Sequence, residues 1–166
     1  MDKLRATLDT NIVPLEGLET RAATVGVATA LATVTDRELE SHSHGNTLPS
    51  VERLIETTVW DESPWDGSVF AGESEEDCFE TVLRIISNGS FPKPNAREDL
   101  TQGERTQLRD AMIFCTHVRE GRDIFVTLDT KAFLRDGRKE RLESLYKTRI
   151  MTRQQFVEYL DSRAAI

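Results

Sequence analysis

Apolar residues along this chain recur with two spacings, one typical of strands and the other of amphipathic helices. Residues 4–8 alternate between apolar and polar side chains, so Leu4, Ala6 and Leu8 share one face of an extended segment. Residues 25–35 form a nearly continuous run of apolar, small and β-branched residues. Such a run is typical of a strand that is covered on both faces in a parallel sheet.

A short apolar run at 124–126 and a short segment around Arg149-Ile150-Met151 predict further strands, and helical spacing fills much of the chain between the strands. The predicted helices lie at about 15–23, from 35 through 40, from near Ser50 to 55, and at about 75–86, 101–119, 138–146 and 152–161. Two capping-box patterns, Thr35-Asp-Arg-Glu38 and Thr101-Gln-Gly-Glu104, mark two of the helix starts. This alternation of strands and helices predicts an α/β protein with parallel strands.

The composition adds the expectation of one domain outside the membrane. The chain has 166 residues, of which 38% are hydrophobic and 30% are charged, so it can bury a core of ordinary size. No apolar run is long enough to span a bilayer, and the start Met1-Asp2-Lys3 shows no signal-peptide pattern. Cys78 and Cys115 form no CxxC motif, so we expect free buried thiols in a reducing, cytoplasmic compartment.

The net charge of −8 argues against a protein that coats nucleic acid in general. It does not argue against an enzyme that acts on nucleic acid, because a cluster of acids that holds cations would itself lower the net charge. Acids that follow predicted strands are candidate ligands for such cations.

Asp9 is the first of these acids, in the sequence Leu8-Asp9-Thr10-Asn11 directly after the first predicted strand. Ligands of open α/β sheets gather outside the carboxyl ends of the strands, which suits Asp9 to metal or catalytic work. The alternative is that Asp9 begins a turn or caps the next helix.

Glu38 and Asp129 belong to the same predicted edge of the sheet. Glu38 falls in the first helical turn after the second predicted strand, where it either contributes a carboxylate to the site or only closes the capping box. Asp36 and Glu40 are close alternatives to it. Asp129 follows the strand 124–126, whereas Asp123 precedes that strand, so we favour Asp129.

Asp110 lies within the predicted helix 101–119, on a face shared with Ile113, Phe114 and His117. A buried carboxylate needs an arginine or lysine, a hydrogen-bond network or a cation. If Asp9, Glu38, Asp110 and Asp129 converge, their charges raise one another's pKa values unless cations neutralise them. Hard divalent ions with oxygen ligands, of which Mg²⁺ is one, meet that need.

Four short motifs follow one another along the chain: Leu8-Asp9-Thr10-Asn11, Glu38-Leu39, Asp110-x-x-Ile113, and Phe125-Val-Thr-Leu-Asp129 with Phe133. In this order they resemble the motifs of the PIN domain family. The resemblance implies an α/β/α sandwich of three layers with a central parallel sheet of four or five strands. It suggests a single PIN-like domain over 1–166, with a longer helical and loop segment at about 41–101 than in compact toxin-type members.

The family's activity is Mg²⁺- or Mn²⁺-dependent endonucleolytic cleavage of RNA, in which metal-activated water attacks the phosphodiester. The resemblance implies that Asp9, Glu38, Asp110 and Asp129 are the catalytic, metal-binding acids, and that Thr127, Asn11 and Thr10 orient them. Candidate substrate-binding cations are Lys93, Arg97, Arg105 and Lys131. The partners it suggests are an RNA substrate, an antitoxin or other regulatory protein, and a second copy of the chain, with no membrane.

Two other functions are compatible with parts of the sequence. One is a non-catalytic PIN-like module that binds RNA or protein. The other is a phosphotransferase with Asp9 as nucleophile, but Asn11 stands where such enzymes carry a second Asp.

A few further residues suggest weaker alternatives. His42 and His44 form an H-x-H pair without a third ligand at zinc spacing, so we interpret them as surface residues. Trp60, Trp65 and Phe91 are suited to stacking on a single strand, although burial is the commoner role of such aromatics.

Overall fold

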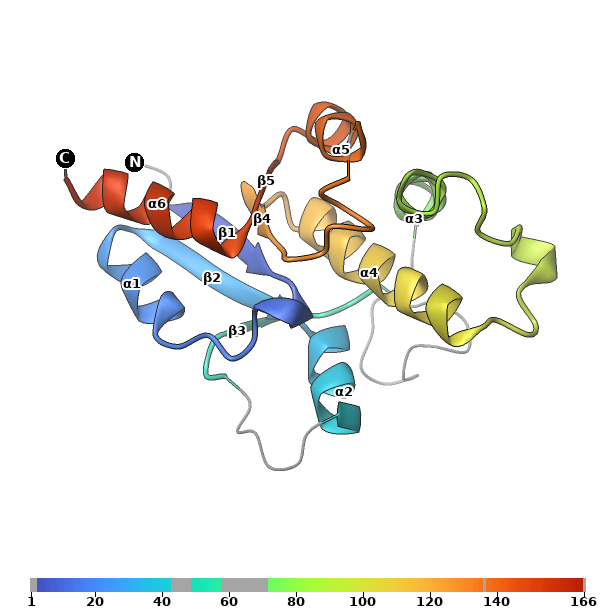
Figure 1. Ribbon diagram of the computed structural model, residues 1–166, viewed down its shortest axis with the longest axis horizontal. Coiled ribbons are helices and arrows are strands. Elements are labelled where there is room, and N and C mark those ends of the chain that lie inside the picture. Colours follow the sequence, from blue (N-terminus) through green and yellow to red (C-terminus); the bar gives the residue numbers. More distant parts are fainter. Residues whose placement is uncertain (1–2, 43–48, 58–71, 136, 166) are drawn as a thin grey trace.

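In the computed structural model, residues 3–42, 49–57, 72–135 and 137–165 are described, and their five strands form one parallel sheet (Figure 1). The strands are β1 (Leu4–Leu8), β2 (Val27–Ala32), β3 (Glu52–Leu54), β4 (Ile124–Val126) and β5 (Arg149–Met151). Their order across the sheet is β3-β2-β1-β4-β5, and every neighbouring pair is parallel.

The described helices connect these strands and cover both faces of the sheet (Figure 1). They are α1 (Leu18–Thr24), α2 (Thr33–His42), α3 (Glu73–Ile86), α4 (Gln102–Arg119), α5 (Arg138–Tyr146) and α6 (Arg153–Ala164), with 3-10 turns η1 (Thr10–Ile12) and η2 (Pro94–Ala96). None of the helices within the described ranges is long and apolar enough to cross a lipid bilayer.

Two hydrophobic cores lie on opposite faces of the sheet. Phe125 of β4 packs into one core with buried residues of α3, α4 and α5. Its neighbours Ile124 and Val126 pack into the other core with residues of α1 and α6. Successive strand residues point to opposite faces, so this three-residue strand contributes to both cores. The architecture is therefore a three-layer α/β/α sandwich, which confirms the fold that the motif resemblance implied.

The strand order places a topological switch point between β1 and β4. From β1 the chain proceeds outward through β2 and β3, and it then returns to the other side of β1 with β4 and β5. Parallel sheets of this kind bind ligands in the crevice outside the carboxyl ends of the two strands at the switch point. Asp9 follows β1 and Thr127 follows β4, so the fold alone predicts a ligand site beside these two residues.

Most element boundaries agree with the sequence prediction. β1, β4, β5 and α5 coincide with the predicted segments, and β2 lies within the predicted run 25–35. The capping box of α4 is present, with the Glu104 N–H donating to Thr101 Oγ1 (3.3 Å) and the Thr101 N–H donating to the Glu104 carboxylate (2.7 Å). α1 begins later than predicted, because Gly17, in the left-handed conformation at φ 82°, forms its N-cap.

The helix predicted from near Ser50 is wrong, because the segment forms β3. Arg53 fixes this extended conformation, since its guanidinium binds Asp36 (2.8 and 3.0 Å) and the carbonyl oxygens of Pro49 and Val51. Apolar residues over so short a segment fit the spacing of a helix as well as that of a strand. Pairing with β2 determines that the segment is a strand.

The capping box predicted at Thr35 is also wrong. α2 begins at Thr33, so Thr35 and Glu38 both lie inside the helix. The Thr35 hydroxyl is 3.1 Å from the Thr10 hydroxyl instead of capping a helix. Glu38 is therefore not engaged as the partner of an N-cap residue.

The two cysteines are free, as expected, and lie beside each other where α3 packs on α4. Their Sγ atoms are 3.2 Å apart, with Cys115 buried and Cys78 half-buried. His42 ends α2. His44, Trp60 and Trp65 lie outside the described residues.

Candidate functional site

Asp9 lies directly after β1 and is almost fully buried, with 2% of its surface exposed. Its N–H donates to the carbonyl of Val126 (2.9 Å), which joins it to the end of β4. One carboxylate oxygen accepts the N–H of Thr10 (2.8 Å), and the other accepts the hydroxyl of Thr127 (2.7 Å) and the amide of Asn11 (3.0 Å). Asp9 thus caps η1, as the alternative interpretation had it, and it also faces the loop after β4.

Asn11 and Thr127 join the two loops at the switch point. The Asn11 side-chain oxygen accepts the N–H of Leu128 (2.9 Å), while its amide binds Asp9. The buried Thr127 hydroxyl donates to Asp9 and accepts the N–H of Asp129 (3.0 Å). Each side chain therefore contacts both loops, which holds the carboxylates of Asp9 and Asp129 in a fixed relation.

Asp129 is half-buried, and backbone groups orient its carboxylate. Its Oδ1 atom accepts the N–H groups of Lys131 (2.8 Å) and Ala132 (2.7 Å). No described residue donates a hydrogen bond to the other oxygen, Oδ2. Asp123, at the opposite end of β4, accepts the N–H of Arg5 (2.8 Å) and lies away from this edge.

Glu38 is half-buried on α2, and its carboxylate accepts a hydrogen bond from the hydroxyl of Thr10. Thr10 thus connects the loop after β1 to the helix after β2. Asp36 is occupied by Arg53, and Glu40 is exposed. Of the three acids that the sequence left open on this helix, the structure favours Glu38.

Asp110 lies in the middle of α4 with only 9% of its surface exposed. No described residue forms an ion pair or a hydrogen bond with its carboxylate. The salt bridge to an arginine, which would have given Asp110 an ordinary structural role, is therefore absent from the described residues. A buried carboxylate without a partner is costly, so this position needs another explanation.

The electrostatics show that the four acids lie close enough to act on one another. Burial raises the pKa of Asp9 to about 6, against hydrogen bonds from Thr127 and Thr10 that lower it, and the charges of Glu38 and Asp129 raise it further. Burial also raises the pKa of Asp110 well above its ordinary value, and the charges of the other three acids add to this effect.

The ligand chemistry of this cluster suits a hard divalent cation. All four groups are carboxylates, and Asp110 together with Asp129 Oδ2 offers oxygen atoms that no described residue occupies. Mg²⁺ and Mn²⁺ take such ligands and would supply the positive charge that the cluster lacks. Among the described residues, no three Asp, Glu, His or Cys side chains are arranged to hold a metal ion as they stand.

The four basic residues predicted to bind substrate differ in exposure and in whether another residue already binds them. Lys131 is exposed two residues after Asp129, and Lys93 is exposed before η2. Arg97 forms a double ion pair with Glu80 (2.7 and 2.8 Å) and stacks over Phe91 at 5.0 Å, which argues against a role for either residue in binding RNA. Arg105 also has a partner.

Glu56 and His117 are among the buried titratable residues that the sequence did not single out. Glu56 follows β3 at the same edge as the acids and binds Arg37 (2.6 Å) and the Thr33 hydroxyl (3.1 Å). The sequence would have indicated Glu56 as an acid that follows a strand if the segment near Ser50 had been predicted as a strand instead of a helix. His117 is fully buried in α4, and burial together with the Arg122 charge lowers its pKa to about 3.

A comparison with models of known protein families finds no match for the chain, and a comparison with curated proteins finds none.

Proposed function

We propose that this protein is a divalent-metal-dependent endoribonuclease of the PIN type. The cation, Mg²⁺ or Mn²⁺, would be held by Asp9, Glu38, Asp110 and Asp129. The observation that carries the proposal is Asp110, a buried carboxylate without a partner among the described residues and within the electric field of three other carboxylates. A cation at the switch point would remove this cost and would lie where parallel sheets bind ligands.

The residues of the chain would have distinct tasks. Thr127 and Asn11 hold the Asp9 carboxylate in one orientation, and Thr10 relates Glu38 to it. With a pKa of about 6, Asp9 is mostly ionised at neutral pH, and cation binding would displace the remaining proton. A bound divalent ion supplies Lewis-acid charge that activates water and stabilises the leaving oxygen.

Histidine does not serve as general base in this proposal. Both ring nitrogens of His117 lie at hydrogen-bond distance from buried hydroxyls, those of Thr7 (2.9 Å) and Thr148 (2.7 Å), and its lowered pKa keeps the ring neutral. Hydrolysis would break the bond between phosphorus and the 3′ oxygen, which leaves a 5′-phosphate and a 3′-hydroxyl.

The PIN resemblance also suggests the proposed partners and location. RNA is the substrate, and an antitoxin or another regulatory protein, or a second copy of the chain, is the proposed protein partner. The free thiols of Cys78 and Cys115 support action in the reducing cytoplasm.

The test is cleavage of a mixed pool of structured and single-stranded RNAs with Mn²⁺ or Mg²⁺ and, in parallel, with EDTA. Asp9→Asn and Asp110→Asn remove site charges, and Asp77→Asn on the exposed surface of α3 is the matched control. We expect metal-dependent cutting by the wild type and the control, and loss of cutting in both site variants. RNA binding without cutting under any condition would instead favour the non-catalytic module.

A further inference from the structure

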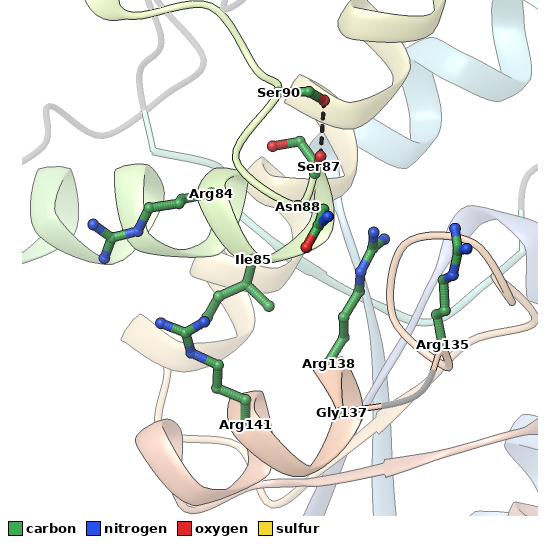
Figure 2. A pocket seen from close by; sticks show the side chains of 9 residues that line it. All are labelled: Arg84, Ile85, Ser87, Asn88, Ser90, Arg135, Gly137, Arg138 and Arg141. Carbon is green, nitrogen blue, oxygen red and sulfur yellow. Dashed lines mark hydrogen bonds between the residues drawn. The ribbon is translucent and has the colours of Figure 1, made fainter.

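A pocket of about 570 Å³ opens between the C-terminal end of α3 and the N-terminal half of α5 (Figure 2). Four arginines line it, Arg84 from α3, Arg135 before α5, and Arg138 and Arg141 from α5. Among the described residues that line it, none is an aspartate or glutamate. In a chain with a net charge of −8, such a concentration of positive charge calls for an explanation.

Three of these arginines have no partner within the described part of the chain. Arg84, Arg135 and Arg141 are exposed, and no ion pair or hydrogen bond with a described residue engages their guanidinium groups. Arg138 is half-buried and donates to the carbonyl oxygens of Ile86 and Lys131, which fixes its position at the pocket wall. The four arginines line one hollow, and an anion bound there would offset the repulsion between their like charges (Figure 2).

The remaining polar groups of the pocket also suit an anion. The exposed Asn88 side chain contributes an amide, and the N-terminus of α5 begins at Gly137, which has no side chain to cap the helix. The guanidinium group of arginine binds phosphate with two parallel hydrogen bonds, and the N-terminus of a helix favours negative charge. Phosphate is therefore the ligand group that this pocket matches best.

The pocket lies close along the chain to the acid edge of the sheet. The N–H of Leu134 donates to the carbonyl of Asp129 (3.0 Å), so Arg135 begins roughly 10 Å from that acid. The N–H of Lys131 donates to the Asp129 carboxylate, while its carbonyl accepts from Arg138. One short loop thus joins the acid to the pocket wall.

We propose that this arginine pocket binds backbone phosphates of the RNA strand whose cleaved phosphodiester lies at the acid edge. The inference rests on the proposed ribonuclease function and names the surface that the substrate occupies beside the metal site. Contacts to phosphates carry no sequence information, so the pocket would position the strand without selecting its sequence. It would also supply the positive charge that an acidic protein needs to hold a polyanion.

The experiment measures binding of a single-stranded RNA of about 20 nucleotides by fluorescence anisotropy at several salt concentrations. All proteins carry Asp110→Asn, so that the strand is not cut. The double variant Arg84→Gln/Arg141→Gln removes two pocket charges. Lys3→Gln/Lys147→Gln removes two exposed charges that do not line the pocket and is the matched control.

We expect the pocket variant to bind RNA about 10-fold more weakly and with a salt dependence that is shallower by about one unit of slope. The control should change affinity by less than about 2-fold. Arg84→Lys/Arg141→Lys should recover most of the affinity, which separates loss of charge from loss of fold. Equal RNA affinity of the pocket variant and the control overturns the proposal.

A second arm uses inorganic phosphate as the probe, at constant ionic strength. Competition with RNA in the protein with an intact pocket, but not in the pocket variant, supports recognition of backbone phosphate. If phosphate binds the pocket while the pocket variant keeps full RNA affinity, the pocket serves a free anion and the RNA proposal is overturned.

Failure of this inference is distinguishable from failure of the proposed function. If the chain with an intact Asp110 cuts RNA with metal, and the pocket substitutions change neither binding nor cutting, only the pocket assignment is wrong. If the arginine substitutions weaken RNA binding while no protein cuts RNA, only the nuclease proposal is wrong.

Discussion

At the scale of single residues, Asp110 gives the strongest support for a metal site, because its carboxylate is buried without a partner among the described residues. Burial and three neighbouring acids raise its pKa, so its charged form destabilises the metal-free fold. We predict that Asp110→Asn, measured by thermal unfolding in EDTA at pH 7.5, raises the melting temperature by about 2–6 °C. The exposed substitution Asp77→Asn should leave it unchanged, and a lower melting temperature for Asp110→Asn would contradict this interpretation.

Thr127 provides a second test at this scale, because its hydroxyl donates to Asp9 and accepts from the N–H of Asp129. Thr127→Val keeps the shape of the side chain and removes these hydrogen bonds together with the one that the hydroxyl accepts from the Asn11 amide (3.3 Å). We predict that affinity for Mn²⁺, measured by titration calorimetry, falls about 10–100-fold. Thr127→Ser retains the hydroxyl and should bind nearly as well as the wild type. Equal affinities of the valine and serine variants would show that Thr127 does not position the acids.

Strand-end logic placed Asp9, Thr127 and Asp129 correctly from the sequence, because a short apolar run followed by an acid defines both the strand and its edge. The sequence could not show that Asp110 lacks a partner. That property depends on which arginines reach it, and Arg37, Arg53 and Arg97 are all engaged by other acids. The sequence could not predict the arginine pocket either, because its arginines come from two helices and from the loop before one of them.

At the scale of elements, α4 carries Asp110 and depends on a reciprocal cap at its N-terminus. Thr101 and Glu104 satisfy each other's backbone N–H groups there. We predict that Thr101→Ala lowers the free energy of unfolding by about 1 kcal/mol, measured by urea denaturation. Metal affinity of the folded protein should be unchanged, because the cap lies more than two helical turns from Asp110. A loss of metal affinity as large as that expected for Asp110→Asn would show that the end of the helix helps to form the site.

Elements with local signals were predicted well, and those decided by tertiary contacts were not. The α4 cap and the short strands β4 and β5 follow from residues within the segment itself. β3 depends on the pairing of Arg53 with Asp36 and on the backbone of β2, which no local pattern reveals. Pairing with a neighbouring strand overrides weak local periodicity in so short a segment.

At the scale of the whole molecule, the acid cluster should make metal-free stability depend on pH. A carboxyl group whose pKa is higher in the folded state than in the unfolded state stabilises the fold below its unfolded pKa. That contribution is lost as the pH rises through the folded pKa. For Asp9, with a pKa near 3.8 unfolded and about 6 folded, the window runs from about pH 4 to 7 and the loss is about 3 kcal/mol. The buried Asp110 adds to the loss in the same direction.

We therefore predict that the free energy of unfolding in EDTA falls more steeply between pH 5 and 8 for the wild type than for Asp110→Asn. Urea denaturation at each pH measures the difference. Saturating Mn²⁺ should reduce it, because a bound cation favours the ionised carboxylates. Parallel pH profiles of the two proteins would show that Asp110 does not carry the raised pKa on which this prediction depends.

The central claim is that acids from separate segments form one divalent-cation site, and calorimetric titration with Mn²⁺ at pH 7.5 tests it most directly. We predict that the wild type and the Asp77→Asn control bind the ion, and that Asp9→Asn and Asp110→Asn each lose at least about 10-fold in affinity. Unchanged binding in both site variants would contradict the claim. Absence of binding by the wild type, with or without a single-stranded RNA present, would contradict it equally.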